Sequence, residues 1–362
     1  MQPEPENQPR SPRPARRPRY FGTHPTQYAD RYKELDPNAY PDTKEHVLSQ
    51  GRTPAGSHVP VLVNEVVSCL RPAAGETVAD CTIGYGGHAA ELLRHISPGG
   101  RLIGFDVDGV ELERTGLRLA EAGWAECVTL HRGNFAGIAK ALGPTGIEGY
   151  DIVFADLGVS SMQVDDPSRG LSYKNDGPLD MRLDDRLNKT AADLVATLGV
   201  EELSEAFFTL ADEPDHERIA QEIVRRQANE PLRRTSQLVR LIFEAKRISY
   251  RAWKKDASAR SGLLHPAARV FQALRMLVND ELGSLQQLLR IAPYCLRPGG
   301  RIGVISFHSG EDRLVKHSFR DGVAIGAYEA ASEDVIRPTS EEVRSNPRSS
   351  AAKFRWAGKS WR

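Results

Sequence analysis

A glycine turn at Gly84–His88 (GYGGH) separates the short apolar run 78–82 from an amphipathic stretch that begins at Ala89. Glycines let the backbone N–H groups of such a turn approach a bound ligand closely. Asp106 ends a second apolar run, 102–105, at about the interval at which nucleotide-binding folds place a carboxylate on a ribose diol. Together the turn and the carboxylate predict a site for a cofactor that contains adenosine.

Polar residues also follow later apolar runs, where a sheet would present them at one edge. Asp156 ends the run 150–155, and a carboxyl at the end of a buried strand needs a partner or a ligand. Phe135 fits either an adenine contact or the core. His308 fits a base, a phosphate donor or a structural histidine, which is the commonest case. The loop 176–182 fits the lining of a site as well as an ordinary turn with a surface ion pair.

The elements that must position these residues alternate between strand and helix patterns. The alternation predicts a parallel sheet that helices cover on both faces. The strand patterns occur at 76–82, 101–107, 126–131 and 150–157, and the helical patterns at 61–70, 88–96 and 109–122.

From about 166 to 264 the sequence has only helical patterns, which predict a helical insertion. The clearest are 191–198, 201–210, 216–227 and 235–246. A helix is then expected from Pro266, a residue type favoured at the first helical position, with the apolar stripe Phe271, Leu274, Val278 and Leu282. Another helical pattern at 285–296 ends at Pro-Gly-Gly, and the apolar run 301–307 predicts a strand with which the sheet resumes.

The chain has 362 residues, of which 40% are hydrophobic, and this is enough for a large core and more than one folding unit. The formal net charge of zero argues against a uniformly basic nucleic-acid binder. Locally, residues 215–260 carry 12 Lys and Arg against 6 Asp and Glu, and residues 344–362 carry 6 basic residues and no acidic one. These segments are candidate phosphate-facing surfaces, although charge runs are as often ordinary solvated faces.

The four cysteines lie far apart and form no CxxC pair, so neither a disulfide framework nor a metal site is expected. This use of cysteine fits a reducing, cytoplasmic compartment. No apolar run approaches the roughly 18 residues of a membrane span, and the N-terminus does not resemble a signal peptide. We therefore expect a soluble, unprocessed protein without a membrane partner, and a flexible Pro- and Arg-rich extension at 1–56.

Eight ordered motifs carry a family resemblance between about residues 58 and 320. They are HVPVL at 58–62, TIGYGGH at 82–88, DLGVSS at 156–161, RG at 169–170, DGPLDMR at 176–182, HPAAR at 265–269, FQALR at 271–275 and SFHS at 306–309. In these motifs the chain resembles the bacterial small-subunit ribosomal RNA cytosine-N4 methyltransferases, the MraW or RsmH family. The departures are modest: Cys81 stands where the family usually has glycine, Gly310 stands where leucine is common, the region after Arg320 is short, and the residues before 57 lie outside the usual pattern.

The resemblance implies a class I, Rossmann-like α/β methyltransferase fold with an inserted all-helical domain. It also implies that S-adenosylmethionine donates a methyl group to N4 of a decoding-centre cytidine of 16S rRNA in the small ribosomal subunit. The expected parts are the extension 1–56, the methyltransferase domain at 57–165 and 265–322, the helical insertion for RNA recognition at 166–264, and a basic tail at 323–362. By position, the family's cofactor contacts fall on Gly86, Gly87, His88, Asp106, Phe135, Asp156 and Gln163.

A role in the chemistry is predicted for Asp156. The lone pair of a cytosine amine is delocalised into the ring, so an acceptor on its N–H group would help to localise that pair, and orientation must supply much of the rate. The target base must also leave its stack while other contacts hold the surrounding RNA. The candidate substrate residues are Asp180, Arg182, Arg233, Arg234, His265, Arg269, Arg275, His308 and Arg348.

Rival functions remain open for the same residues. A nicotinamide-dependent oxidoreductase would share the glycine turn and Asp106, but no catalytic Tyr/Lys or Ser/Tyr arrangement stands out. A ribosome-assembly factor that keeps the fold without catalysis, or a methyltransferase for another RNA, would share the motifs. We expect the assembled subunit rather than free RNA as the substrate, because a pocket that selects one cytidine needs structured surroundings. The sequence leaves the oligomeric state open.

Overall fold

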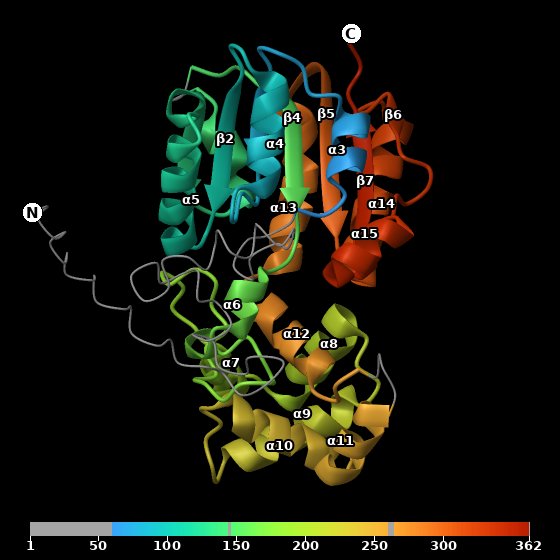
Figure 1. The fold of residues 1–362 in the computed structure, drawn as a ribbon. Coiled ribbons are helices and arrows are strands. Elements are labelled where there is room, and N and C mark those ends of the chain that lie inside the picture. The colour runs from blue at the N-terminus through green and yellow to red at the C-terminus, as the bar shows by residue number, and fades with distance from the viewer. Residues whose placement is uncertain (1–59, 144–145, 260–263, 362) are drawn as a thin grey trace, which may run out of the picture. The chain divides into compact units, whose positions relative to one another are not determined.

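The computed structural model describes residues 60–143, 146–259 and 264–361, which belong to one compact unit. The predicted extension 1–56 and the first two residues of the 58–62 motif lie outside the described residues. The unit is built on one seven-stranded sheet with the strand order β3-β2-β1-β4-β5-β7-β6 (Figure 1). The strands are β1 (Thr77–Asp80), β2 (Arg101–Asp106), β3 (Val128–Arg132), β4 (Tyr150–Asp156), β5 (Leu296–Ser306), β6 (Ala330–Ala331) and β7 (Lys353–Gly358).

The first five strands are parallel, and β7 runs antiparallel to both of its neighbours. All four residues of β1 are buried, as expected for a central strand of a sheet that is covered on both faces. The direction in which successive strands are added reverses between β1 and β4, and ligands bind beside the carboxyl ends of strands at such a point. The predicted Rossmann-like α/β fold is thus confirmed.

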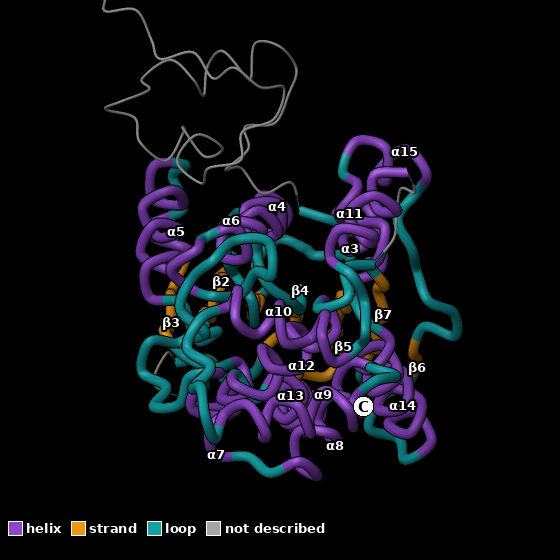
Figure 2. Tube along the Cα trace, turned by 90° about the horizontal axis from the view of Figure 1, so that it is seen from below, coloured by secondary structure: helices purple, strands orange, loops and turns teal. Residues whose placement is uncertain are grey.

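Helices cover both faces of the sheet, and Figure 2 shows the two groups on opposite sides of the strands. One face packs against α3 (Val63–Leu70), α4 (Gly87–Ile96) and α5 (Gly109–Glu121). The other packs against α13 (Glu281–Cys295), α14 (Ser309–Ala324) and the 3-10 segment η3 (Phe135–Ala141). Each face has its own buried apolar cluster. These clusters hold the helices against the strands and so fix the positions of the residues at the strand ends.

The chain between β4 and α13 folds into a helical region with a third buried cluster. After the short α6 (Ser161–Asp165) and η4 (Pro167–Arg169), this region contains α7 (Ala191–Thr197), α8 (Val200–Ala211), α9 (His216–Gln227), α10 (Thr235–Ala245), α11 (Tyr250–Ala259) and α12 (Ala268–Val278). The predicted helix 216–227 has the observed bounds of α9. The helical region is joined to the sheet through α6 and through α12, which leads into α13 (Figure 1).

Residues 323–362, predicted to form a basic tail, instead complete the sheet. The strand β7 lies between β5 and β6, which the sequence patterns did not indicate. One of its basic residues, Arg355, is only 5% exposed and forms an ion pair with Asp312 at 2.7 Å. Glu342, from α15 (Ser340–Ser345), accepts a hydrogen bond from the backbone N–H of Leu62 at 2.8 Å, so this segment also fixes the start of α3.

The helix predicted to begin at Pro266 begins at Ala268 and ends at Val278. Asp280 adopts a left-handed conformation with φ of 46°, which interrupts the helical path. Leu282, assigned from the sequence to the same apolar stripe, therefore belongs to α13.

In the described ranges, no helix combines the length and apolar character needed to cross a membrane. The same ranges contain no group of three or more His, Cys, Asp or Glu placed to hold a metal ion. All four cysteines are free thiols.

Candidate active site

A cavity of about 300 Å³ lies at the carboxyl ends of β1, β2 and β4. Its wall combines the glycine turn, the ends of these strands, the start of α6, and residues 279–284 at the junction of α12 and α13. Three residues of the loop before α7 also line it: Leu183, Asp184 and Leu187. We call this cavity the sheet-edge cavity.

The glycine turn bends into the cavity with a backbone that few other residues can adopt. Gly84 and Gly86 have φ of 46° and 88°. A Cβ atom on Gly86 would lie 3.0 Å from the Thr115 methyl group, and one on Gly87 would lie 3.1 Å from Pro60. The Thr115 hydroxyl donates a hydrogen bond to the Gly84 carbonyl, so α5 supports the turn from behind.

The ring of Tyr85, in the middle of this turn, is held by Arg118 of α5. The guanidinium carbon lies 3.8 Å from the ring centroid, a cation–π contact. Arg118 itself donates to Glu111 and to the Thr115 hydroxyl, both at 2.6 Å. Tyr85 and Glu111 both line the cavity, so this cluster fixes one wall. Sequence reasoning missed Glu111 and Arg118, which pair only because of the helical spacing within α5.

Asp106, at the end of β2, has both carboxylate oxygens oriented by backbone N–H groups. Oδ2 accepts from Gly84 at 3.0 Å, and Oδ1 accepts from Asp108 at 2.9 Å. Burial raises the pKa of Asp106 to about 6, although the backbone N–H groups of Asp108 and Gly84 lower it. Each oxygen keeps a further lone pair, so this carboxylate can accept hydrogen bonds from the two hydroxyls of a ribose.

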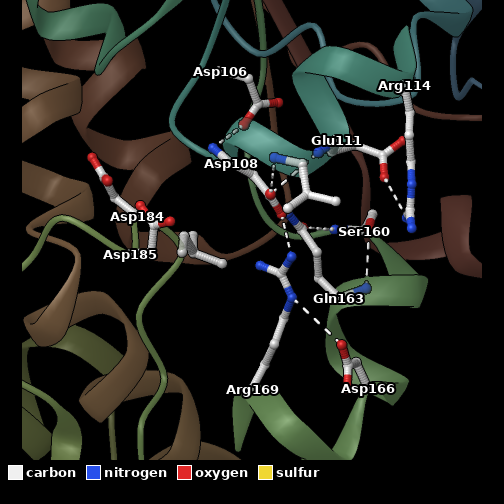
Figure 3. A network of polar contacts seen from close by, with 12 residues as sticks. Asp106, Asp108, Glu111, Arg114, Ser160, Gln163, Asp166, Arg169, Asp184 and Asp185 are labelled. Atoms are coloured by element: carbon white, nitrogen blue, oxygen red, sulfur yellow. Dashed lines mark hydrogen bonds and ion pairs between the residues drawn. The ribbon is translucent and has the colours of Figure 1, made fainter.

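Asp108 is the centre of a polar network behind Asp106 (Figure 3). It is 4% exposed, accepts from Gln163 Nε2 at 3.0 Å and contacts Arg169 Nη2 at 2.6 Å. Gln163 Oε1 accepts from the backbone N–H of Ser160 at 2.9 Å. Gln163 therefore lines the cavity while both ends of its amide bind protein groups. The network joins the loop after β2 to the first turns of the helical region, and the sequence analysis did not single out Asp108.

Asp156 ends β4 in the cavity wall, and one of its carboxylate oxygens has no hydrogen-bond partner among the described residues. Its Oδ2 lies 3.5 Å from His88 Nδ1, and His88 Nε2 lies 2.8 Å from the Val61 carbonyl. Its Oδ1 is buried and has no hydrogen-bond partner within the described part of the chain. Burial, together with the charges of Asp80 and Glu311, raises the pKa of Asp156 to about 8. A buried oxygen without a partner indicates a place for a ligand donor.

Asp80, at the end of β1, is a third buried carboxyl at this edge. It is 1% exposed, and its Oδ2 has no partner in the described ranges. Burial raises its pKa to about 7, although the backbone N–H of Thr82 lowers it. Asp80, Asp106 and Asp156 thus place weakly solvated carboxyls at one strand edge. A ligand that carries positive charge fits this electrostatic environment, as the sulfonium of S-adenosylmethionine does.

The predicted cofactor residues gather at the cavity, with one difference in role. Gly86 is not part of the lining but sets the turn at the start of α4. Phe135 both lines the cavity and packs against the buried cluster beneath it, so its two readings are compatible. The predicted residues that line the cavity are Gly87, His88, Asp106, Phe135, Asp156 and Gln163.

Several predicted substrate residues form ion pairs or hydrogen bonds with other protein groups. Arg182 pairs with Asp180 at 2.7 Å and donates to the Leu187 carbonyl, so the pair orders its own loop. Arg275 forms a two-point ion pair with Glu281 at 2.7 and 2.9 Å. His308 is not in the cavity lining; its Nδ1 accepts from the backbone N–H of Glu311 at 3.3 Å and caps α14.

The other predicted substrate residues lie apart from the cavity lining. Arg234 binds Asp176 at 2.6 Å, while its neighbour Arg233 is exposed and has no ion pair within the described ranges. Arg269 donates to the Asp212 carbonyl. Arg348 is exposed in η5 (Pro347–Ala351). His265 stacks on Tyr173 in the helical region, with ring centroids 4.3 Å apart.

Comparisons with known proteins identify the family. The profile of the MraW methylase family matches residues 55–360. Ribosomal RNA small subunit methyltransferase H 1 of Lachnoclostridium phytofermentans is 41% identical over 345 residues, which are 94% of this chain and 92% of the relative. Ribosomal RNA small subunit methyltransferase H of Symbiobacterium thermophilum is 43% identical over 313 residues, with 82% and 95% covered.

A coverage of 94% is possible only if part of 1–56 is aligned, so the similarity to the Lachnoclostridium relative enters the extension. The family profile itself begins at residue 55, so almost all of the extension lies outside the family pattern, as expected. Among solved structures, a putative rRNA-methylase from Clostridium thermocellum is similar with a TM-score of 0.39 and 13% identity, covering 84% of this chain and 100% of that chain. With its Rossmann-like sheet and strand-edge cavity, the chain belongs to the MraW methylase family and is an S-adenosylmethionine-dependent methyltransferase.

Proposed function

We propose that this methyltransferase modifies N4 of a decoding-centre cytidine of 16S rRNA in the assembled small ribosomal subunit. The observation that carries the proposal is the buried, unpartnered Oδ1 of Asp156 in the wall of the sheet-edge cavity. The names of the relatives support the substrate class, since both are called ribosomal RNA small subunit methyltransferases.

The chemistry requires an acceptor at this position. When bound, S-adenosylmethionine supplies a methyl group on a positively charged sulfur. A carbon–sulfur bond breaks, a bond from the methyl carbon to N4 forms, and one proton leaves the amine. Asp156 Oδ1 accepts an N–H of the amine, which localises its lone pair and orients it toward the methyl carbon at about 3 to 3.5 Å.

The same carboxyl is suited to take the departing proton. Its raised pKa of about 8 means that the ionised form is a good proton acceptor once it is present. His88, 3.5 Å from Oδ2 and bound to the Val61 carbonyl, holds the carboxyl in place. Because Asp156 is largely protonated at neutral pH without a ligand, the reaction is expected to speed up as pH rises through this pKa.

The helical region supplies the surface for RNA in this proposal. Its segment 215–260 has the basic excess noted in the sequence, and Arg233 is exposed there. Cations on such a surface hold phosphates while the target base leaves its stack and enters the cavity.

The decisive experiment uses labelled S-adenosylmethionine and small subunits that lack N4-methylation. The expected result is N4-methylcytidine at one decoding-centre position, identified by mass spectrometry of the digested rRNA. Free 16S rRNA is the matched substrate and should react more slowly. Cofactor binding without incorporation into any RNA would instead favour a ribosome-assembly factor that has kept the fold.

A further inference from the structure

A second cavity, of about 710 Å³, lies in the helical region and shares no lining residue with the sheet-edge cavity. It is bounded by residues 173–176, by α10, by the first turn of α11, and by His265. Figure 1 shows α10 and α11 on the side of the helical region away from the sheet. Its volume falls in the range of pockets for small organic ligands. We call it the aromatic cavity.

Five rings surround this cavity. Tyr173 and His265 stack nearly parallel, with centroids 4.3 Å apart and 14° between their planes. The ring of Phe243 forms T-shaped pairs with the rings of Tyr250 and Trp253, with centroid distances of 5.3 and 5.7 Å. A buried core accounts for Phe243, which is 5% exposed, but not for Tyr250, which is 55% exposed. An exposed ring at the edge of an aromatic cluster offers a stacking surface for another flat group.

The rim of the aromatic cavity carries unpaired positive charge. Lys174 and Arg240 line it, are exposed, and form no ion pair with a described residue. Its two acidic residues are already neutralised, because Asp176 binds Arg234 at 2.6 Å and Glu244 binds Arg226. A cationic rim around ring faces suits an anion attached to a flat aromatic group.

Two polar groups inside the cavity support the same ligand. Trp253 Nε1 is buried and has no hydrogen-bond partner within the described ranges, and a buried indole N–H usually finds an acceptor. Burial lowers the pKa of His265 to about 4, with help from Lys174 and Lys246. The imidazole is therefore neutral at physiological pH and stacks without charge repulsion from the rim cations.

We propose that the aromatic cavity binds one unpaired nucleotide of the RNA substrate, distinct from the cytidine that is methylated. Its base stacks on Tyr250 and the neighbouring rings, its edge accepts from Trp253 Nε1, and its phosphate contacts Lys174 and Arg240. Unpaired bases are recognised in this way, by ring stacking combined with backbone cations. The inference rests on the proposed RNA substrate class, because it names a second contact to the same molecule.

The test titrates the full-length protein with a fluorescently labelled single-stranded RNA decamer and with a hairpin that pairs the same sequence. The wild type should prefer the single strand. Tyr250→Ala should weaken binding of the single strand about tenfold, the cost of one lost base stack, whereas Tyr250→Phe should keep near wild-type affinity. Lys174→Gln and Arg240→Gln should each reduce the salt slope by about 0.7 for a lost phosphate contact.

Matched controls lie outside the cavity. Tyr294, on α13, is 86% exposed, and Tyr294→Ala removes a tyrosine ring without touching the aromatic cavity. Lys316, exposed on α14, serves likewise as Lys316→Gln. Both should bind the decamer like the wild type. Thermal unfolding and S-adenosylmethionine affinity, unchanged in every variant, show that the fold and the sheet-edge cavity are intact.

The outcomes separate this proposal from the proposed function. Equal binding by Tyr250→Ala, Tyr250→Phe and Tyr294→Ala would overturn the nucleotide site, even if the wild type methylates small subunits. Equal binding of the decamer and the hairpin would overturn it as well. If the wild type methylates no subunit but the Tyr250 series behaves as expected, the cytidine-N4 proposal fails and the nucleotide site stands.

Discussion

The two cavities present opposite kinds of surface. The sheet-edge cavity is built from strand ends and a glycine turn, and its lining includes two buried carboxyls, Asp106 and Asp156, whose pKa values are raised to about 6 and 8. The aromatic cavity lies in the helical region, and its unpaired charged groups are exposed cations at a rim of rings. The first surface suits a positively charged reactive centre, and the second suits a polyanion. If both proposals hold, the chemistry and the binding of RNA are assigned to separate parts of the chain.

The largest effect is expected from Asp156→Asn, because this change removes the proton acceptor but keeps the size of the side chain. Single-turnover methyl transfer at saturating cofactor should fall by about a hundredfold or more. Asp165→Asn, on α6 and outside the cavity lining, is the matched control and should be near wild type. Decamer binding should not change in either variant. A normal transfer rate for Asp156→Asn would remove Asp156 from the chemistry and weaken the contrast between the cavities.

A second prediction uses the charge of the sheet-edge cavity. Asp106 and Asp156 are protonated below their raised pKa values and ionise as pH increases from about 6 to about 8. S-adenosylmethionine carries a positive sulfur, whereas that of S-adenosylhomocysteine is neutral. The ratio of their affinities should therefore shift toward S-adenosylmethionine by about tenfold over this range. Calorimetric titration of both ligands measures it, and a ratio that is independent of pH would contradict the electrostatic account.

A third prediction separates two neighbouring arginines of the helical region. Arg233 is exposed without an ion pair in the described ranges, whereas Arg234 binds Asp176. Arg233→Gln should weaken binding to the small subunit about threefold and reduce the salt slope by roughly one phosphate contact. Arg234→Gln should change the slope less. Both substitutions should leave cofactor affinity unaltered. A larger change of the salt slope for Arg234→Gln than for Arg233→Gln would show that the ion pair of Arg234 with Asp176 opens when RNA binds.

The smallest effect is expected where the helical region covers the sheet-edge cavity. Arg132, at the end of β3, contacts Asp185 and lies 3.8 Å from Asp184, in the loop that lines the cavity. Exposed pairs of this kind contribute up to about 1 kcal/mol. Arg132→Gln should therefore raise the dissociation rate of S-adenosylhomocysteine about twofold to fivefold, measured by stopped-flow fluorescence. An unchanged rate would mean that the loop is held by other contacts, such as Asn279 to the backbone N–H of Leu183 at 2.8 Å.

The parts predicted from the sequence are those set by local pattern. Buried parallel strands are continuous apolar runs, amphipathic helices have a regular apolar period, and a glycine turn can be recognised from its composition. The strand-end carboxyls Asp106 and Asp156 followed from these elements, because the carboxyl ends of neighbouring parallel strands meet at one edge. Asp106 and Asp156 could therefore be placed before the structure was known. The full set of predicted cofactor residues came from the family resemblance.

The parts that were missed depend on pairings between distant residues. In the sequence, the residues of β7 look like a basic surface segment. Arg355 can be buried there only because it pairs with Asp312 on α14, which is distant in the sequence. His308 could not be assigned as a helix cap until α14 was placed. The aromatic cavity assembles rings from residues 173, 243, 250, 253 and 265, and no local pattern connects these positions.

The place of β7 has a consequence for biosynthesis. β6 is bonded to β7, and β7 to β5, yet β7 is the last of the seven strands to be translated. While residues 353–358 are still unmade, the nascent chain exposes the backbone edge of β5, and β6 has no strand to join. An open edge is a template for pairing with other chains. A product that stops before residue 353 is thus expected to aggregate, because the sheet is complete only once residues 353–358 have been made.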